Sequence, residues 1–349
     1  MTSAVFRGRV WRNGGMSLRL DERTIAVNLA LLCGLAALGV WSISAGDFPI
    51  TIGDVLRTLG GQGEGAQNFI VFGLRLPRLF TGVFTGMALG LAGAMFQSLA
   101  RNPLASPDII GFDSGAALGA VTLVILVGTT GTLVAAGAIG GGIVTAAVVF
   151  ALSWRKGGVT PLRLVLVGIG VGFFAHAGVD FLMTRSDIFE AAAAQAWLTG
   201  SLNARLWSHV WIVAAGLAVL MPLALLLQPG LERIELGDDL AAALGVRVNA
   251  TRFGIGLIGV LLASFAVASA GPLPFVALVS GPIARRITSG SGVTLVTAAL
   301  VGAVVVTAGD LAGRLVFAPT QLPVGVFTAV LGAPYLLWLL ATQIRKGAM

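Results

Sequence analysis

"LRLPRLFTGVFTGMALGLAGAMFQSLARNPLASPDIIGFDSGAALGA", residues 74–120, contains two apolar runs separated by one short polar turn. A helix that spans a bilayer needs about 20 mainly apolar residues, which is the length each run offers together with its continuation. The turn, ARNPLASPD, carries Pro103 and Pro107, which cannot continue a helix. The stretch therefore predicts two membrane-crossing helices joined by a rigid turn, and we expect the role of this turn to be structural.

The composition of the whole chain extends this reading. The 349 residues are 56% hydrophobic and 11% charged, with a mean hydropathy of +0.94, which leaves too little polar surface for a soluble domain. The net charge of +7 lies in short loops between apolar runs, where basic residues set membrane orientation, so no nucleic-acid partner is expected. A single cysteine, Cys33, excludes an intrachain disulfide and a cysteine-based metal site.

The apolar runs predict an all-α polytopic membrane protein with about ten transmembrane helices. One transmembrane domain is expected over 25–343, between an N-terminal tail at 1–24 and a C-terminal tail at 344–349. The predicted spans are 25–45, 79–99, 109–128, 132–153, 161–183, 207–228, 252–270, 272–288, 293–316 and 324–343.

Basic residues predict the orientation of these spans. With the N-terminus inside, the inner segments hold sixteen Lys and Arg and the outer segments six, which accounts for all 22. An excess of basic residues in the cytoplasmic loops is the usual rule, so both tails are expected in the cytoplasm. The long polar segment 229–251 falls on the same side, and 186–200 is expected to form a short outer helix.

Enzymatic signals are weak. Neither lysine is followed by Ser or Thr, so the phosphate-binding loop of ATPases is absent. Small residues four apart, such as Gly82, Gly86 and Gly90, indicate close helix packing in lipid and not a cofactor site. His176 and Asp180 share a helical face, which favours a polar pair lining a water-accessible path over a proton relay.

Residues 74–120 closely resemble the FecCD or BtuC-like permeases, the membrane subunits of ABC importers for iron–siderophore complexes and vitamin B12. Further stretches agree in order, and NPLASPDIIGF is most similar to permeases for ferric catecholates of the enterobactin type. Two departures are Gly281-Pro282 in place of the family's Pro-His and Gln321 in place of a glutamate. The agreeing stretches are LGDDLAAALG (236–245), GPLPFVALVSGPIARR (271–286), AGDLAGR (308–314) and QLPVGVFTAVLGAPYLLWLL (321–340).

The resemblance implies a permease that moves a ferric siderophore across the bacterial cytoplasmic (inner) membrane without enzymatic activity or a bound cofactor. It implies a second permease subunit, with a homologous partner favoured over a homodimer, and an extracytoplasmic siderophore-binding protein. Two cytoplasmic ATPase subunits would hold the ATP and Mg. A vitamin B12 or heme importer permease is an alternative. An ion-coupled secondary transporter using the acids Asp113, Asp180 and Asp310 is another.

The resemblance also implies site residues. The cytoplasmic loop 229–251 would dock into the ATPase, with a helix that begins at the carboxylates of Asp238 and Asp239, which favour a helix N-terminus, and ends near Gly245. The alternative is a solvated amphipathic loop with no partner. The matching positions are Leu236, Gly237, Asp238, Asp239, Ala241, Leu244 and Gly245.

Three outer arginines and one inner loop complete these expectations. Arg75, Arg78 and Arg314 would receive acidic side chains of the binding protein. The alternatives are contacts with lipid phosphate for Arg75 and Arg78, and an i,i+4 pair with Asp310 for Arg314. Gly157 and Gly158 would give hinge freedom to a cytoplasmic gate loop over 154–161.

Overall fold

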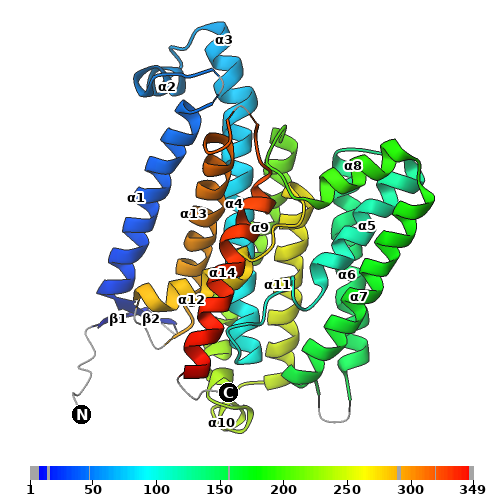
Figure 1. Cartoon of the computed structure of the whole chain (residues 1–349). Helices are drawn as coiled ribbons and strands as arrows, with labels where there is room; N and C mark the ends of the chain where they lie inside the picture. The colour runs from blue at the N-terminus through cyan, green and yellow to red at the C-terminus, as the bar shows by residue number, and fades with distance from the viewer. Residues whose placement is uncertain are drawn as a thin grey trace.

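The computed structural model is a bundle of helices with one small hairpin at its N-terminal end (Figure 1). It describes residues 8–13, 16–46, 48–155, 158–288, 292–318 and 320–345. Its strands are β1 (Gly8–Asn13) and β2 (Met16–Asp21). Its helices are α1 (Glu22–Ser44), α2 (Ile52–Leu59), α3 (Gly65–Asn68), the π-helical η1 (Phe69–Arg75), α4 (Leu76–Ala100), α5 (Phe112–Val127), α6 (Thr132–Ser153), α7 (Pro161–Arg185), α8 (Ile188–Leu198), α9 (Trp207–Glu235), α10 (Asp238–Ala243), α11 (Val248–Ala270), α12 (Val276–Thr288), α13 (Leu295–Leu315) and α14 (Val324–Arg345).

Each predicted span coincides with one helix of the bundle. Among the described residues, eight helices are long and apolar enough to cross a membrane. The other two predicted spans are α5, with 16 residues, and α12, with 13. Both are short because non-helical chain precedes them at 101–111 and 271–275. The hairpin, α10 and the C-terminal end of α14 lie at the same end of the bundle (Figure 1), which agrees with an even number of crossings.

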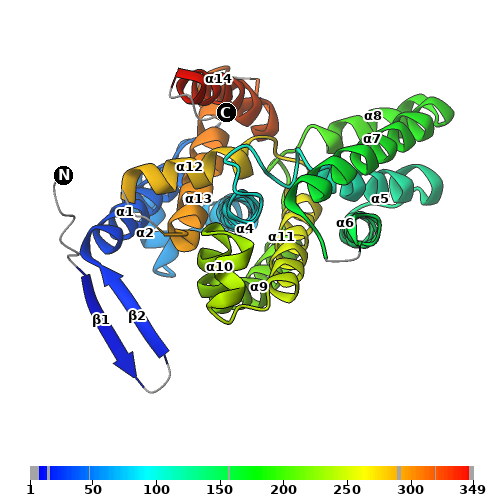
Figure 2. The same ribbon diagram turned by 90° about the horizontal axis from the view of Figure 1, so that it is seen from below.

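Helix α4 forms the centre of the bundle and lies between α13 and α11 (Figure 2). Its crossing with α13 is built on glycines, because the backbone of Gly86 meets that of Gly302, and the backbone of Gly90 meets that of Ala298. Apolar burial offers no drive for helix association in lipid, so close backbone packing of this kind holds spans together. The small-residue pattern of 82–94 is therefore a packing feature, as predicted.

This crossing gives a first testable prediction. We expect Gly90→Leu to lower the melting temperature of the purified protein clearly, because a Cβ at Gly90 would collide with the carbonyl oxygen of Ala298, and such overpacking costs about 1–3 kcal/mol or more. Gly170→Leu is the matched control, since a Cβ there meets nothing within 4 Å. Equal melting temperatures for the two variants would contradict the tight crossing.

Some elements were not predicted. The tail expected at 1–24 contains the hairpin, with Val10 opposite Arg19, and α1 already begins at Glu22. The outer segment before Arg75 folds into α2, α3 and η1. The polar segment expected over 229–251 is mostly helical, because α9 continues through Pro222 and Pro229 to Glu235. The outer helix expected within 186–200 is present as α8.

Candidate docking faces

The predicted coupling segment is a short helix at the end of the bundle that is predicted to face the cytoplasm, called the inner end. Gly237 precedes α10 with φ 118°, and Gly245 follows it with φ 80°, so both ends need backbone angles that glycine adopts easily. Asp238 and Asp239 occupy the first turn, where carboxylates favour the helix dipole. The predicted start and end of this helix are therefore confirmed.

The surface of this segment is apolar where it faces outward. Leu236, Leu240 and Leu244 are 63%, 58% and 56% exposed, whereas Ala241 is fully buried against the bundle. Three exposed leucines at nearly helical spacing form a patch suited to a partner protein. Leu240 was missing from the predicted set, although its spacing of four from Leu236 and Leu244 places it on the same face.

Asp238 fixes this helix to the rest of the bundle. Its Oδ1 accepts a hydrogen bond from Arg101 at 2.8 Å and another from Arg252 at 2.9 Å, and its Oδ2 accepts from Arg252 at 3.0 Å. Arg252 is 3% exposed and also donates to the carbonyl oxygen of Val159 at 2.6 Å. One carboxylate therefore links α10 to the end of α4, the start of α11 and the segment that leads into α7.

The predicted gate loop, 154–161, includes Val159, whose carbonyl oxygen accepts from Arg252. Gly157 lies outside the described residues. Gly158 has φ 105° and sits so close to Asn249 in the first turn of α11 that a Cβ would collide with that side chain. This glycine serves close packing as well as backbone freedom, which ties the loop to α11.

A cavity of about 270 Å³ opens beside α10. Within it, Arg285 lies 3.4 Å from Glu235 and donates to Gln97 at 3.2 Å. Arg285 therefore joins α12 to α9 and α4 at the same inner end. The cavity is lined by Gln97, Arg101, Asn102, Pro103, Glu235 and Arg285.

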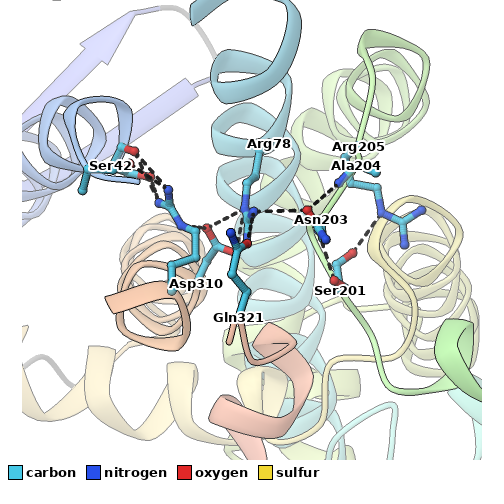
Figure 3. Close-up of polar contacts among 10 residues, drawn as sticks. Ser42, Arg78, Ser201, Asn203, Ala204, Arg205, Asp310 and Gln321 are labelled. Atoms are coloured by element: carbon cyan, nitrogen blue, oxygen red, sulfur yellow. Dashed lines mark hydrogen bonds and ion pairs between the residues drawn. The ribbon is translucent and has the colours of Figure 1, made fainter. Parts of the chain in front are cut away.

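At the opposite end of the bundle, Asp310 pairs with two of the predicted outer arginines (Figure 3). Arg78 donates from Nε at 3.0–3.1 Å and from Nη2 at 2.8 Å, so that it binds both carboxylate oxygens. Nε of Arg314 lies 3.3 Å from Asp310 Oδ2, within ion-pair distance although it is not aligned as a hydrogen bond. The side chains of Asp310 and Arg314 are 6% and 7% exposed.

The arginines also hold the end of α1. Arg314 donates to the carbonyl oxygens of Ser42 and Ala45, and Arg75 donates to those of Ile43 and Phe48. The last carbonyl groups of a helix lack partners within it, and guanidinium groups satisfy them well. These contacts fasten α1 to η1 and α13.

The contacts of the three outer arginines bear on their predicted role in docking the binding protein. The i,i+4 pair of Arg314 with Asp310, considered above as an alternative, forms. Because Arg75, Arg78 and Arg314 all bond to acceptors of this chain, their docking with a binding protein stays a prediction. Arg57 on α2, which sequence reasoning did not single out, is 74% exposed and lies 3.9 Å from Asp54.

A partly buried loop arginine lies at the same end of the bundle. Arg205, between α8 and α9, donates from Nε to the carbonyl oxygen of Ser201 at 2.9 Å (Figure 3). Burial lowers the pKa of its guanidinium to about 10, which leaves the side chain charged at neutral pH.

The predicted pair of His176 and Asp180 does not form a polar contact in the structure. The described part of the chain contains no group of three or more His, Cys, Asp or Glu residues that would hold a metal ion. His176 and Asp180 are both exposed on α7, and the structure shows no hydrogen bond or ion pair between them.

The chain is similar in sequence to known permease proteins along nearly its whole length. The chain is 38% identical over 327 residues to the ferric enterobactin transport system permease protein FepG of Escherichia coli, covering 94% of this chain and 99% of that protein. It is 39% identical over 339 residues to the achromobactin transport system permease protein CbrC of Dickeya dadantii, covering 96% of each.

A solved structure described as the inward-facing conformation of a metal-chelate type ABC transporter superposes with a TM-score of 0.81. It is 26% identical and covers 91% of this chain and 99% of that one. The FecCD transport family model matches residues 34–342. The predicted resemblance is confirmed, and this chain belongs to the FecCD transport family.

Proposed function

We propose that this chain is the permease subunit of an ATP-driven importer that carries a ferric siderophore into the cytoplasm. The observation that carries the proposal is the match along nearly the whole chain to permeases of ferric chelate transport systems. Three exposed leucines in and beside α10, Leu236, Leu240 and Leu244, fit this role because they give a separate ATPase subunit an apolar surface to bind, on a segment that Asp238 holds against the bundle.

The partners follow from the same role. Two ATPase subunits would bind ATP and Mg and dock at α10, and a siderophore-binding protein would dock at the opposite end. A second permease subunit would complete the path, and similarity to FepG favours a homologous partner over an identical copy. The chain itself would need no bound cofactor. The membrane would be the bacterial cytoplasmic membrane, with both tails inside.

Transport by the reconstituted complex tests the function. Proteoliposomes that contain both permeases and the ATPase are supplied with binding protein loaded with radioactive ferric enterobactin. We expect uptake that requires internal ATP hydrolysis and continues after ionophores collapse the membrane gradients. Uptake that stops with the ionophores and continues without the ATPase would identify an ion-coupled secondary transporter instead.

Capture of the binding protein gives a second prediction. Arg57 is accessible without breaking an internal network, whereas Arg78 is 15% exposed and bound to Asp310. We expect Arg57→Glu to slow association of the binding protein several-fold at low salt, with the effect fading at high salt, because rim charges act mainly on the association rate. Arg57→Lys is the control that keeps the charge. Association rates by surface plasmon resonance that are equal for both variants at low salt would exclude Arg57 from docking.

A further inference from the structure

The chain has a second cavity, of about 280 Å³, between α5 and α7. It differs from the apolar surroundings because three of its lining side chains are a carboxylate, a hydroxyl and an imidazole, from Asp108, Ser114 and His176. None of the described residues that line it is Lys or Arg. Its lining residues are Asp108, Ile109, Gly111, Ser114, Ile169, Gly172, Phe173 and His176.

The cavity lies deep within the membrane-spanning region. The segment 101–111 begins at Arg101, beside Asp238 at the inner end, and ends where Gly111 packs against the backbone of Gly172. Gly172 is about 16 Å along α7 from Pro161, at 1.5 Å per residue. Non-helical chain at this depth is tolerated only where it is buried in protein or lines a water-filled cavity.

A second non-helical segment reaches the same point from the outer end. The segment 271–275 starts where Gly271 packs against Gly200, and the backbone N–H of Phe275 then donates to Asp108 Oδ2 at 3.4 Å. Phe275 has φ 66°, a left-handed backbone that is rare for an aromatic residue. Two short helices, α5 and α12, therefore begin inside the membrane on either side of Asp108.

Residues 106–113, at the end of the first segment and the start of α5, hold polar atoms without partners. Ser106 Oγ, Asp108 Oδ1 and Asp113 Oδ1 are buried and have no hydrogen bond in the structure. A buried acceptor without a donor costs about 1–3 kcal/mol, and more when it is charged. Of these residues Asp108 lines the cavity, so its carboxylate favours a molecule in the cavity that brings donors, such as water, hydroxyl groups or amide N–H groups.

The face of α7 beside the cavity carries two ionisable side chains. His176 is exposed near the middle of α7, on the side where Phe173 is 72% exposed, and Asp180 is exposed on the same side, one turn nearer the C-terminal end of the helix. Ionisable side chains at membrane depth turn toward a bundle interior or a water-filled space. This face of α7 therefore borders an aqueous path in the assembled transporter.

From these observations we propose that the cavity between residues 108–114 and α7 is a hydrated binding site for the chelate in transit. This inference rests on the proposed function. The ligand is an oxygen-rich metal chelate that presents hydroxyl or amide N–H donors, which Asp108, Ser114 and His176 accept. The absence of Lys and Arg from the described lining makes the site a poor one for a chelate whose rim carries only carboxylates.

Cysteine accessibility tests the site in the complete transporter. In a Cys33→Ala background, Ser114→Cys is compared with Val144→Cys, which is 62% exposed near the middle of α6 among apolar side chains. A water-soluble methanethiosulfonate reagent reacts with the thiolate, which forms in water and not in lipid. We expect Ser114→Cys to react at least tenfold faster than Val144→Cys in proteoliposomes. Equal, slow reaction of both would overturn the hydrated site.

Protection by the chelate tests the ligand. Binding protein loaded with ferric enterobactin, with ATP present, is expected to slow modification of Ser114→Cys at least threefold. Adding Asp108→Asn is expected to remove that protection, while the retained amide oxygen still accepts from the Phe275 N–H. Protection that survives Asp108→Asn, or is absent while the unmodified transporter imports the chelate, would overturn the binding site. If the unmodified transporter imports nothing, the proposed function fails, and the comparison without chelate still tests the hydrated cavity.

Discussion

Asp310→Asn is expected to destabilise the outer end of the bundle by about 3–5 kcal/mol, the cost of removing one partner from a buried ion pair. The side chain of Asp310 is 6% exposed and forms ion pairs with both Arg78 and Arg314. Without its charge, two guanidinium groups remain close together with little access to water. The variant should therefore melt at a clearly lower temperature and lose the attachment of α1 first, because Arg314 also holds Ser42.

Asp54→Asn is the matched control. Asp54 pairs with Arg57 at 3.9 Å, and these side chains are 36% and 74% exposed, so the pair contributes about 0–1 kcal/mol. Thermal unfolding followed by circular dichroism compares the two variants, and limited proteolysis after Ser44 reports detachment of α1. Equal melting temperatures for Asp310→Asn and Asp54→Asn would contradict a structural role for the outer cluster.

Hydropathy predicted the spans well because each is a continuous apolar run. Its errors lie where backbone chemistry decides the boundary. The eighth span was expected to begin at 272, but Pro272 and Pro274 lie in non-helical chain and α12 begins at Val276. In the opposite direction, α9 passes through Pro222 and Pro229 without ending, so proline alone does not mark the edge of a span.

The candidate site could be predicted only in part, since the sequence locates a helix better than its partners. Gly237 and Gly245 marked the ends of α10 through their backbone freedom. Arg101, which binds Asp238, is 137 positions away, and Arg78 is 232 positions from Asp310. Counting charges assigned these arginines to a side of the membrane, whereas their ion pairs depend on how distant helices pack.

The second large effect is expected at Asp238, where Asp238→Asn should uncouple ATP hydrolysis by the ATPase subunits from transport through the permease. Arg252 is 3% exposed and would keep only neutral acceptors, the carbonyl oxygen of Val159 and the amide oxygen that the substitution retains. Arg101 would lose its ion pair with α10 as well, because that amide oxygen carries no charge. We expect uptake to fall at least tenfold while the ATPase still hydrolyses ATP, because α10 would move without pulling on α4, α11 and the segment before α7.

Asp239→Asn is the control that distinguishes loss of the Asp238 ion pairs from loss of one negative charge. Asp239 lies in the same first turn of α10 but is exposed, and the structure shows no ion pair for it. Both variants change the net charge equally and keep the leucines that would grip the ATPase, so the ATPase should co-purify with each. Only Asp238→Asn should raise the ATP consumed per iron imported. If both variants import iron with the same ATP cost, the motion of the ATPase does not reach the bundle through the Asp238 carboxylate. The exposed leucines alone must then transmit that motion.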